Sequence, residues 1–355
     1  MLTGNKGEWS EIYALFKVLG DKELQPGDKD LNKIKDLVYP VLKVLRCESG
    51  HNFEYGIEDD FVIVSGDEEV LRISVDDFKS NAQVLLRQIK SSNGTFSIPE
   101  IEEFMKTINC LSLKASSSVK TDITIVIHDQ RTGLQPTLGF SIKSQLGGAS
   151  TLLNAGKTTN FIFKISDLTL SKEQIDEINA KPKIKERIDE ITTLKGKLVF
   201  SKVESSIFEN NMVLIDSSLP ELIAECTYLY YTSSKSTISD IISEIAEINP
   251  LSYNTETGHP FYSYKMKHFL TDIALGMMPS KVWTGQLDAT GGYLVIKEDG
   301  DVLCYHIYNR NEFEDYLLNN TKFETASTSR HEFGTIYKEG DDLFINLNLQ
   351  IRFIK

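Results

Sequence analysis

The chain has 355 residues, of which 41% are hydrophobic and 25% are charged. These values are typical of a folded globular protein and exclude the disordered, collagenous and membrane-protein classes. Its 38 basic and 51 acidic residues give a formal net charge of −13 at pH 7, which argues against a protein that coats nucleic acid non-specifically.

The length exceeds that of most single domains, so we expect two domains or one α/β domain with a large insertion. No apolar run of about 18 residues is present, and the N-terminus lacks the apolar segment of a signal peptide. The cysteines are far apart and form no Cys-x-x-Cys pair, which argues against a zinc cluster and a disulfide framework. We therefore expect a cytoplasmic protein without a membrane partner. The cysteines are Cys47, Cys110, Cys226 and Cys304.

The first hundred residues contain a helix, a hairpin and two further helices. Apolar residues recur at helical spacing over residues 7–20. Two β-rich runs joined by a polar turn predict a hairpin over residues 60–74. Helices are expected over residues 75–90 and from Pro99, where proline and early carboxylates suit a helix N-terminus. Residues 38–45 predict only short strands or helical turns.

The centre of the chain predicts the order strand, strand, helix, strand. Residues 122–128 are almost all β-branched after the first, as in a central strand. A turn over residues 129–136 leads to a paired strand at residues 138–143. A short helix is expected at residues 150–155, and a third strand at residues 160–165.

The last half of the chain is expected to be mainly helical, with strands near the C-terminus. We expect helices within residues 171–194, 217–233, 238–248 and 265–275, a hairpin at residues 291–307, and a terminal strand at residues 342–354.

Basic residues are concentrated in the centre despite the acidic total. Residues 114–164 contain two acidic residues, Asp122 and Asp129, and six basic ones. A binding cleft can therefore be basic while the outer faces are acidic. The basic residues are Lys114, Lys120, Arg131, Lys143, Lys157 and Lys164.

Asp122 and Lys143 are the candidate catalytic pair. Phosphodiester hydrolysis needs a carboxylate-held divalent cation and a positive charge near the reacting phosphate. Asp122 opens one strand, and Lys143 lies near the end of the next. A turn centred near Gly133 brings both to one end of the sheet.

Several segments resemble the HpaII restriction endonuclease family. The resemblance covers both ends of the chain and its centre. It lies in residues 7–11, 121–123, 139–144, 150–155, 159–161, 274–277, 283–285 and 347–353.

This resemblance implies a PD-(D/E)XK nuclease, which is an α/β fold with a mixed central sheet flanked by helices, here with additional N-terminal and C-terminal α+β elements. It implies a Mg²⁺ site in which Asp122 is a metal ligand and Lys143 is the catalytic lysine. Ser141 stands where the motif has its second acidic residue. A neutral hydroxyl is a poor Mg²⁺ ligand, so the site uses fewer carboxylates or takes one from elsewhere.

Glu11 and Glu8 on the first helix are the main candidates for the missing metal ligand. Their alternative role is to stabilise the helix N-terminus through its dipole. Asp129 is a further candidate, with turn formation as its alternative. His128 is either a general base or a residue that ends the strand.

We expect three consecutive regions. Residues 1–112 form an N-terminal region whose helix packs on the nuclease core, residues 113–215 form that core, and residues 216–355 provide DNA recognition and dimer contacts.

Polar and basic residues around the motif are candidates for DNA contacts, with capping turns or solvated surface as their alternatives. Arginine pairs with guanine in the major groove, so arginines near the C-terminus are the candidate base readers, with exposed surface as their alternative. The backbone candidates are Lys120, Arg131, Ser144, Gln145, Asn154 and Lys157, and the base-reading candidates are Arg330, His331 and Arg352, with Arg310 beside them.

The resemblance implies a type II restriction endonuclease that cuts double-stranded DNA, at or near CCGG, as a homodimer paired with a cognate DNA methyltransferase. Ser141 and the net negative charge leave a second hypothesis open, a non-catalytic DNA-binding or partner-binding protein on a decayed nuclease fold. A third is a metal-dependent hydrolase of a small phosphoester.

Overall fold

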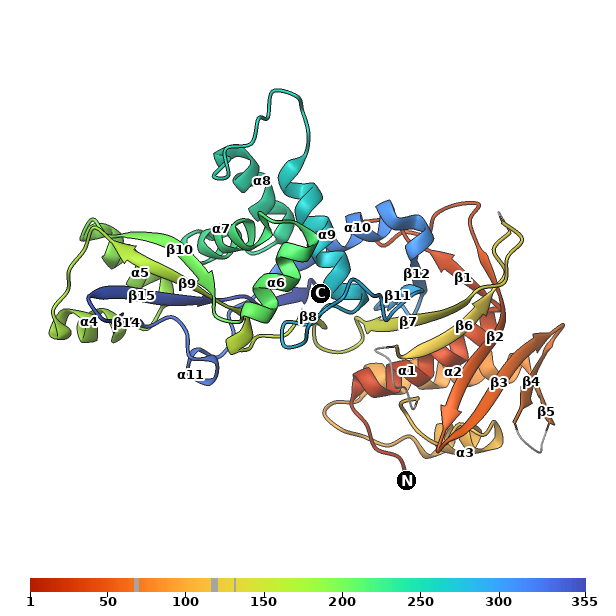
Figure 1. The fold of residues 1–355 in the computed structure, drawn as a ribbon. Helices are drawn as coiled ribbons and strands as arrows, with labels where there is room; N and C mark the ends of the chain where they lie inside the picture. The colour runs from red at the N-terminus through yellow and green to blue at the C-terminus, as the bar shows by residue number, and fades with distance from the viewer. Residues whose placement is uncertain (67–69, 116–120, 131) are drawn as a thin grey trace. The chain divides into compact units, whose positions relative to one another are not determined.

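Two compact units make up the chain, and each combines segments that are far apart in the sequence (Figure 1). A computed structural model describes residues 1–66, 70–115, 121–130 and 132–355. Unit 1 comprises residues 1–150, 287–316 and 355, and unit 2 comprises residues 151–286 and 317–354.

Unit 1 contains one large sheet and helices on both of its faces (Figure 1). Its elements are α1 (Lys6–Asp21), β1 (Glu23–Pro26), β2 (Tyr39–Glu48), β3 (His51–Glu58), β4 (Phe61–Ser65), β5 (Val70–Ser74), α2 (Val75–Ser91), α3 (Pro99–Thr107), β6 (Ile123–Ile127), β7 (Thr137–Ser144), β11 (Gly292–Ile296), β12 (Val302–His306), η2 (Ile307–Asn309) and α10 (Arg310–Asn319), whose last residues belong to unit 2.

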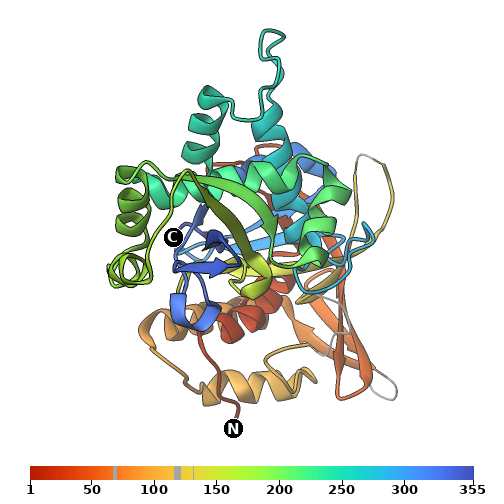
Figure 2. The same ribbon diagram turned by 60° about the vertical axis from the view of Figure 1, so that its left-hand side comes forward.

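The sheet of unit 1 is mixed. Its strand order is β1-β12-β11-β7-β6-β2-β3-β4-β5. β7 pairs with β6 in antiparallel and with β11 in parallel orientation. Because β1 also pairs with β2, the strands from β1 to β2 close into a barrel-like ring. The meander β3–β5 extends beyond this ring and is orange in Figures 1 and 2.

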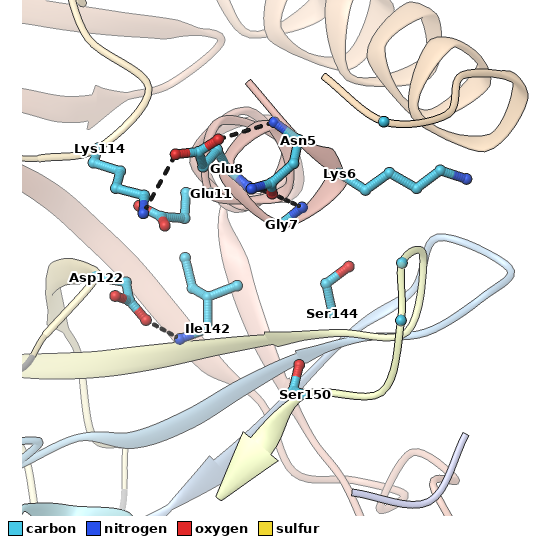
Figure 3. Close-up of a pocket in the computed structure, with 13 residues that line it drawn as sticks. Asn5, Lys6, Gly7, Glu8, Glu11, Lys114, Asp122, Ile142, Ser144 and Ser150 are labelled. Atoms are coloured by element: carbon cyan, nitrogen blue, oxygen red, sulfur yellow. Dashed lines mark hydrogen bonds and ion pairs between the residues drawn. The ribbon is translucent and has the colours of Figure 1, made fainter. Parts of the chain in front are cut away.

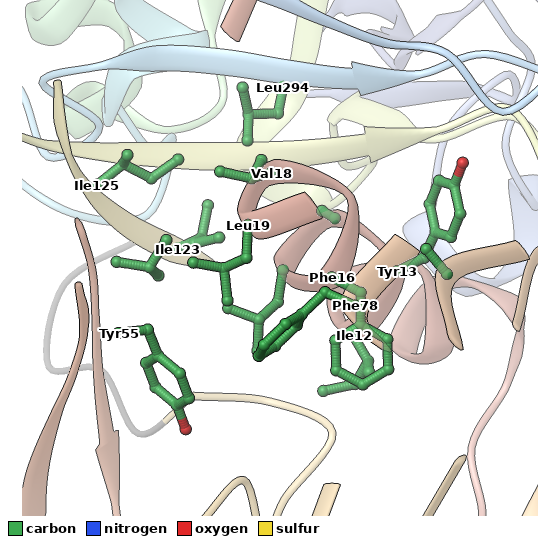
Figure 4. Close-up of a cluster of buried hydrophobic side chains, with 14 of the residues drawn as sticks. Ile12, Tyr13, Phe16, Val18, Leu19, Tyr55, Phe78, Ile123, Ile125 and Leu294 are labelled. Atoms are coloured by element: carbon green, nitrogen blue, oxygen red, sulfur yellow. The ribbon is translucent and has the colours of Figure 1, made fainter. Parts of the chain in front are cut away.

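An apolar core lies between α1 and one face of this sheet (Figure 4). Asn5 caps α1 through a capping box with Glu8, so the helix start is well defined. Phe16 of α1 is fully buried and stacks edge-on against Phe78 of α2. Ile125 of β6 is fully buried in the same core. The apolar spacing seen in the sequence thus positions α1 against the strands that carry Asp122 and Ser141.

The first turns of α10 cover the opposite face. Phe313 packs edge-on against Tyr293 of β11, with ring centroids 5.3 Å apart. Tyr316 stacks on Tyr305 of β12 at 4.0 Å. Side chains on this face of the sheet therefore lie near aromatic rings.

Unit 2 combines two antiparallel sheets with a group of helices. One sheet has the order β10-β9-β15-β14 and the other has the order β13-β16-β8. Helix α7 contacts α5, α6, α8 and α9, and also β10 and β15. The elements are β8 (Thr151–Leu153), η1 (Lys157–Thr159), β9 (Asn160–Ser166), α4 (Lys172–Asn179), α5 (Ile184–Thr193), β10 (Lys197–Val203), α6 (Ser206–Ile215), α7 (Leu219–Thr232), α8 (Ile238–Ile248), α9 (Phe261–Leu275), β13 (Thr321–Phe323), α11 (Thr328–His331), β14 (Ile336–Glu339), β15 (Asp342–Asn348) and β16 (Ile351–Phe353).

The predicted α/β class, with a mixed sheet and flanking helices, is confirmed. Two local predictions were wrong. Residues 150–155 contain strand β8 instead of a helix, because β16 supplies its backbone partners. Residues 342–354 form two strands, β15 and β16, because the first pairs with β9 and the second with β13 and β8.

The two units do not follow the three consecutive regions expected from the sequence. Residues 113–215 are divided between the units, because β6 pairs with β2 of the N-terminal region and β7 with β11, a late segment. Asp122, Ser141 and the N-terminal helix consequently belong to the same unit.

Candidate active site

Asp122 directly precedes β6, and β7 holds one of its carboxylate oxygens. Oδ2 of Asp122 accepts hydrogen bonds from the backbone nitrogen of Ile142 at 2.7 Å and from the hydroxyl of Ser141 at 3.1 Å. No hydrogen bond to the other oxygen, Oδ1, is made by the described part of the chain. The carboxylate is thus oriented through one oxygen while the second remains available.

Ser141 and Lys143 share one face of β7, because side chains two residues apart on a strand point the same way. The Nζ of Lys143 lies 4.9 Å from the ring centroid of Tyr293, which is also on the face covered by α10. Ile142 and Ser144 lie on the opposite face, toward α1. The side chain of Lys143 therefore lies on the face of the sheet that is turned away from α1.

Helix α1 is attached to the end of β7 beside Asp122. The buried hydroxyl of Ser10 donates to Ser144 Oγ at 2.8 Å. This contact lies one residue before Glu11 and positions that turn of the helix over the strand end.

A cavity of about 560 Å³ lies between the start of α1 and the end of β7 (Figure 3). Figure 3 shows the side chains of Glu11, Lys114 and Asp122 facing the same space. The residues that line the cavity are Asn5, Lys6, Gly7, Glu8, Glu11, Gly94, Lys114, Asp122, Ile142, Ser144, Gly147, Gly148 and Ser150.

Glu11 is a perturbed acid in this cavity. Burial, with a smaller contribution from the negative charge of Asp122, raises its pKa from 4.5 to about 7, although Lys114 acts in the opposite direction. Within the described residues, its carboxylate forms neither a hydrogen bond nor an ion pair. Acids whose pKa is shifted by burial and by neighbouring charges in a cleft are common at functional sites.

Glu8, the other candidate on α1, already has partners. Its Oε2 accepts from the backbone nitrogen of Asn5 at 2.9 Å, and its Oε1 lies 3.5 Å from Nζ of Lys114. The helix-capping role considered for Glu8 is therefore present in the structure, while Glu11 takes no part in the cap.

The remaining candidates near the motif occupy different environments. Ser144 lines the cavity. The backbone nitrogen of the next residue, Gln145, donates to the backbone oxygen of Ile296 at 2.8 Å. Asp129 is buried in the turn after β6, where its Oδ2 accepts from Thr132, as expected for turn formation. His128 follows β6 directly. Lys120 and Arg131 lie outside the described residues.

The DNA-contact candidates Lys157 and His331 are neighbours in unit 2. Lys157 on η1 forms an ion pair of 2.6 Å with Glu332, which follows α11. The buried Asn160 donates to the backbone oxygen of His331 at 3.0 Å, and Asn348 donates to Oδ1 of Asn160 at 2.7 Å. This network joins η1 to α11.

The other candidates in unit 2 differ in exposure. Asn154 and Arg330 are exposed, and Arg330 lies on α11. Arg352 on β16 is instead ion-paired with Glu324 at 3.1 Å and is partly buried, which leaves it less accessible than Arg330.

Lys114 is a charged cavity residue that the sequence analysis did not single out as a site candidate. Its only signal in the sequence was membership of the locally basic segment between residues 114 and 164. Its place opposite Asp122 depends on tertiary structure.

Helix length and the state of the cysteines are two further properties of the described structure. No helix within the described ranges is both long and apolar enough to cross a membrane. The four cysteines are free thiols.

Comparisons with known proteins give a consistent result. The family model described as HpaII restriction endonuclease matches residues 5–353. The Type II restriction enzyme HpaII of Haemophilus parainfluenzae is 53% identical to this chain over 356 residues, which cover 99% of each chain. No solved structure matches the chain significantly. This chain therefore belongs to the HpaII restriction endonuclease family and is a type II restriction endonuclease.

Proposed function

We propose that this restriction endonuclease hydrolyses double-stranded DNA at an active site centred on Asp122 and Glu11, and that its recognition sequence is CCGG. The supporting observation is that Glu11 on α1 and Asp122, directly before β6, face one cavity. Within the described part of the chain, Glu11 forms no hydrogen bond or ion pair. The two carboxylates would repel each other less if they held a cation between them. The family membership supplies the reaction class.

The core of unit 1 is proposed to be a PD-(D/E)XK nuclease fold. Asp122 precedes β6, and Ser141 and Lys143 lie two residues apart on the adjacent β7, which is the arrangement that the motif requires. Ser141 occupies the position of the second acid and contacts Asp122 directly. This placement supports the proposed motif, in which a hydroxyl stands at the position of one acid.

Mg²⁺ is the proposed cofactor, and the residues fit it. Mg²⁺ is usually held by one or two carboxylates, with water and substrate phosphate completing its coordination. Glu11 and Asp122 provide that number. No cluster of three or more His, Cys, Asp or Glu side chains suited to a metal occurs among the described residues, so we assign no third protein carboxylate. When bound, the cation polarises the phosphate and acidifies the attacking water.

The protein side chains have separate proposed tasks. Asp122 is oriented through Oδ2 by Ser141 and Ile142, which leaves Oδ1 for the cation. Glu11 supplies the second carboxylate in place of the motif acid, and Glu8 remains an alternative ligand that must first leave its cap. Lys143 provides a positive charge from the face of β7 that carries Ser141.

DNA recognition is proposed to involve both units. Ser144 and Gln145 follow the catalytic strand and are proposed to contact the backbone, as are Lys120 and Arg131. In unit 2, Asn154 and Lys157 are proposed to contact phosphates. Arg330 and His331 on α11, with Arg352 second, are the proposed base readers.

We further propose a cytoplasmic homodimer. A palindromic sequence such as CCGG matches the two-fold symmetry of a dimer. A cognate methyltransferase is the expected companion, because the DNA of the cell that makes the enzyme needs protection at the same sequence.

A digest of a sequenced plasmid tests the proposal. With Mg²⁺ we expect discrete fragments whose ends all map to CCGG, and with a chelator in place of Mg²⁺ we expect intact plasmid. The Asp122→Asn variant is the control for a contaminating nuclease. Fragment ends at another sequence contradict the CCGG assignment, and cleavage that persists in the chelator contradicts the metal-dependent site.

A further inference from the structure

Lys114 is the lysine that faces the two carboxylates of the cavity. Among the described residues that line it, the lysines are Lys6 and Lys114. Lys6 donates its Nζ to the backbone oxygen of Lys90 and points away from Asp122 (Figure 3). Lys114 lies beside Glu11 and lines the same cavity as Asp122, so its positive charge faces both carboxylates.

The backbone that carries Lys114 is anchored by buried polar groups. Arg46 and Glu48 of β2 form an ion pair and are 7% and 2% exposed. Arg46 donates through Nη2 to the backbone oxygen of Ser112, whose hydroxyl lies 2.7 Å from Oε2 of Glu48. A buried ion pair costs desolvation and is retained only with good geometry and further hydrogen bonds. Here it holds the chain two residues before Lys114.

The side chain of Lys114 is weakly held. Its Nζ lies 3.5 Å from Oε1 of Glu8, and the lysine side chain is 60% exposed. Exposed ion pairs of this kind contribute little to stability. Lys114 can therefore leave Glu8 at little cost. A phosphate oxygen is a stronger partner, because it accepts a charge-assisted hydrogen bond from the ammonium group.

We propose that Lys114 is a further catalytic residue, which binds a non-bridging oxygen of the scissile phosphate from the α1 side of the cavity. The inference rests on the proposed function. Lys143 lies on the opposite face of β7 over Tyr293, so the two lysines supply positive charge from different sides of Asp122. Lys114 thus neutralises negative charge that develops on the phosphate, a task that the carboxylates of the cavity cannot perform.

Single-turnover cleavage of a CCGG duplex with Mg²⁺ is the first test. Lys114→Ala is expected to cleave roughly 100- to 1,000-fold more slowly than wild type, the usual effect of removing one donor from developing charge. Lys114→Arg is expected to retain most of the rate. Lys79→Ala is the matched control, because Lys79 is also exposed, lies 3.5 Å from a carboxylate of Asp76 and is absent from this cavity.

A double-mutant cycle separates phosphate binding from a structural role. The scissile phosphate is first mapped with the wild-type enzyme and then replaced by a neutral methylphosphonate in a synthetic duplex. Binding is measured in chelator, so that no cleavage occurs. We expect the neutral linkage to weaken wild-type binding by roughly 3- to 10-fold more than Lys114→Ala binding. Lys79→Ala is expected to behave as wild type.

The outcomes are distinct. Equal effects of the neutral linkage on wild type and Lys114→Ala overturn the assignment, as does cleavage by Lys114→Ala within about twofold of the Lys79→Ala rate. Absence of cleavage by the wild-type enzyme contradicts the proposed function and this assignment together. Normal wild-type cleavage with an unaffected Lys114→Ala variant contradicts the assignment alone.

Discussion

The hydroxyl of Ser141 on β7 donates to Oδ2 of Asp122 over 3.1 Å. The backbone nitrogen of Ile142 donates to the same oxygen over 2.7 Å. A carboxylate at position 141 would repel Asp122, whereas a hydroxyl orients it. In the proposed site, Ser141 therefore supports Asp122 as a metal ligand without being a ligand itself.

Replacing Ser141 is expected to have a moderate effect. Ser141→Ala removes one of two hydrogen bonds to Asp122, and a bond of this kind contributes about 1 kcal/mol. We expect the single-turnover cleavage rate to fall by roughly fivefold, with unchanged DNA binding in chelator. A loss as large as that of Asp122→Asn would show that Ser141 is itself a ligand or a reacting group.

Asp122→Asn and Lys143→Ala are each expected to abolish cleavage and leave cognate binding in place. In the proposed mechanism Asp122 holds the cation and Lys143 supplies charge near the phosphate, whereas most binding energy comes from contacts to the DNA backbone elsewhere. Gel-shift binding and single-turnover cleavage measure the two properties on the same duplex. If either variant cuts at the wild-type rate, its catalytic assignment is wrong.

Glu11→Gln is expected to weaken Mg²⁺ binding by roughly tenfold or more, because it removes one of two carboxylate ligands. Titration calorimetry with Mg²⁺ measures this affinity directly, and circular dichroism checks that the fold is retained. Glu8→Gln is the comparison on the same helix. Glutamine can take the place of glutamate in a capping box, so this variant is expected to keep the helix start and to leave more of the metal affinity. If Glu8→Gln weakened Mg²⁺ binding more than Glu11→Gln does, Glu8 would be the ligand.

Arg330→Ala is expected to reduce discrimination between CCGG and sequences with one altered base pair. A bidentate arginine-guanine contact provides about 1 to 3 kcal/mol, so cognate cleavage should slow by roughly 10- to 100-fold or more. Lys157→Ala should instead weaken binding to all sequences similarly and reduce its salt dependence. Competition binding with cognate and near-cognate duplexes distinguishes a loss of discrimination from a uniform loss of affinity. Equal losses on both duplexes for Arg330→Ala would exclude a base-reading role.

His306 is expected to make the free energy of unfolding depend on pH. Burial lowers its pKa from 6.5 to about 4, with a partly opposing effect of Asp129. The unfolded chain therefore takes up a proton below pH 6.5 that the folded chain accepts only near pH 4. The contribution of neutral His306 to the free energy of unfolding is complete above pH 6.5. It is lost as pH falls toward 4, and the loss is about 2 kcal/mol at pH 5.

Urea unfolding of wild type and His306→Phe at pH 7 and pH 5 checks this expectation. The phenylalanine retains an aromatic ring near Tyr39 and Phe140 but cannot titrate. The decrease in the free energy of unfolding from pH 7 to pH 5 should be smaller in the variant. An identical decrease in both proteins would show that His306 is not the group responsible.

Local sequence determined the elements that carry the candidate site. Apolar residues at helical spacing, with Asn5 and Glu8 at the start, are sufficient to define α1, because capping and amphipathicity act over a few residues. The β-branched run after Asp122 and the turn with Gly133 at φ 72° likewise define the β6–β7 pair. From these, the sequence identified Asp122, Ser141 and Lys143 as neighbours on adjacent strands.

Tertiary structure decided which groups surround Asp122. Glu8 and Glu11 are both acids on one helix, and only packing against β7 leaves Glu8 in the cap and Glu11 beside Asp122. Lys114 reaches the cavity because buried groups of β2 hold its loop. Residues 151–153 form a strand because β16, some 200 positions later in the chain, pairs with them. Contacts between distant segments carry no local pattern, so periodicity and propensity cannot reveal them.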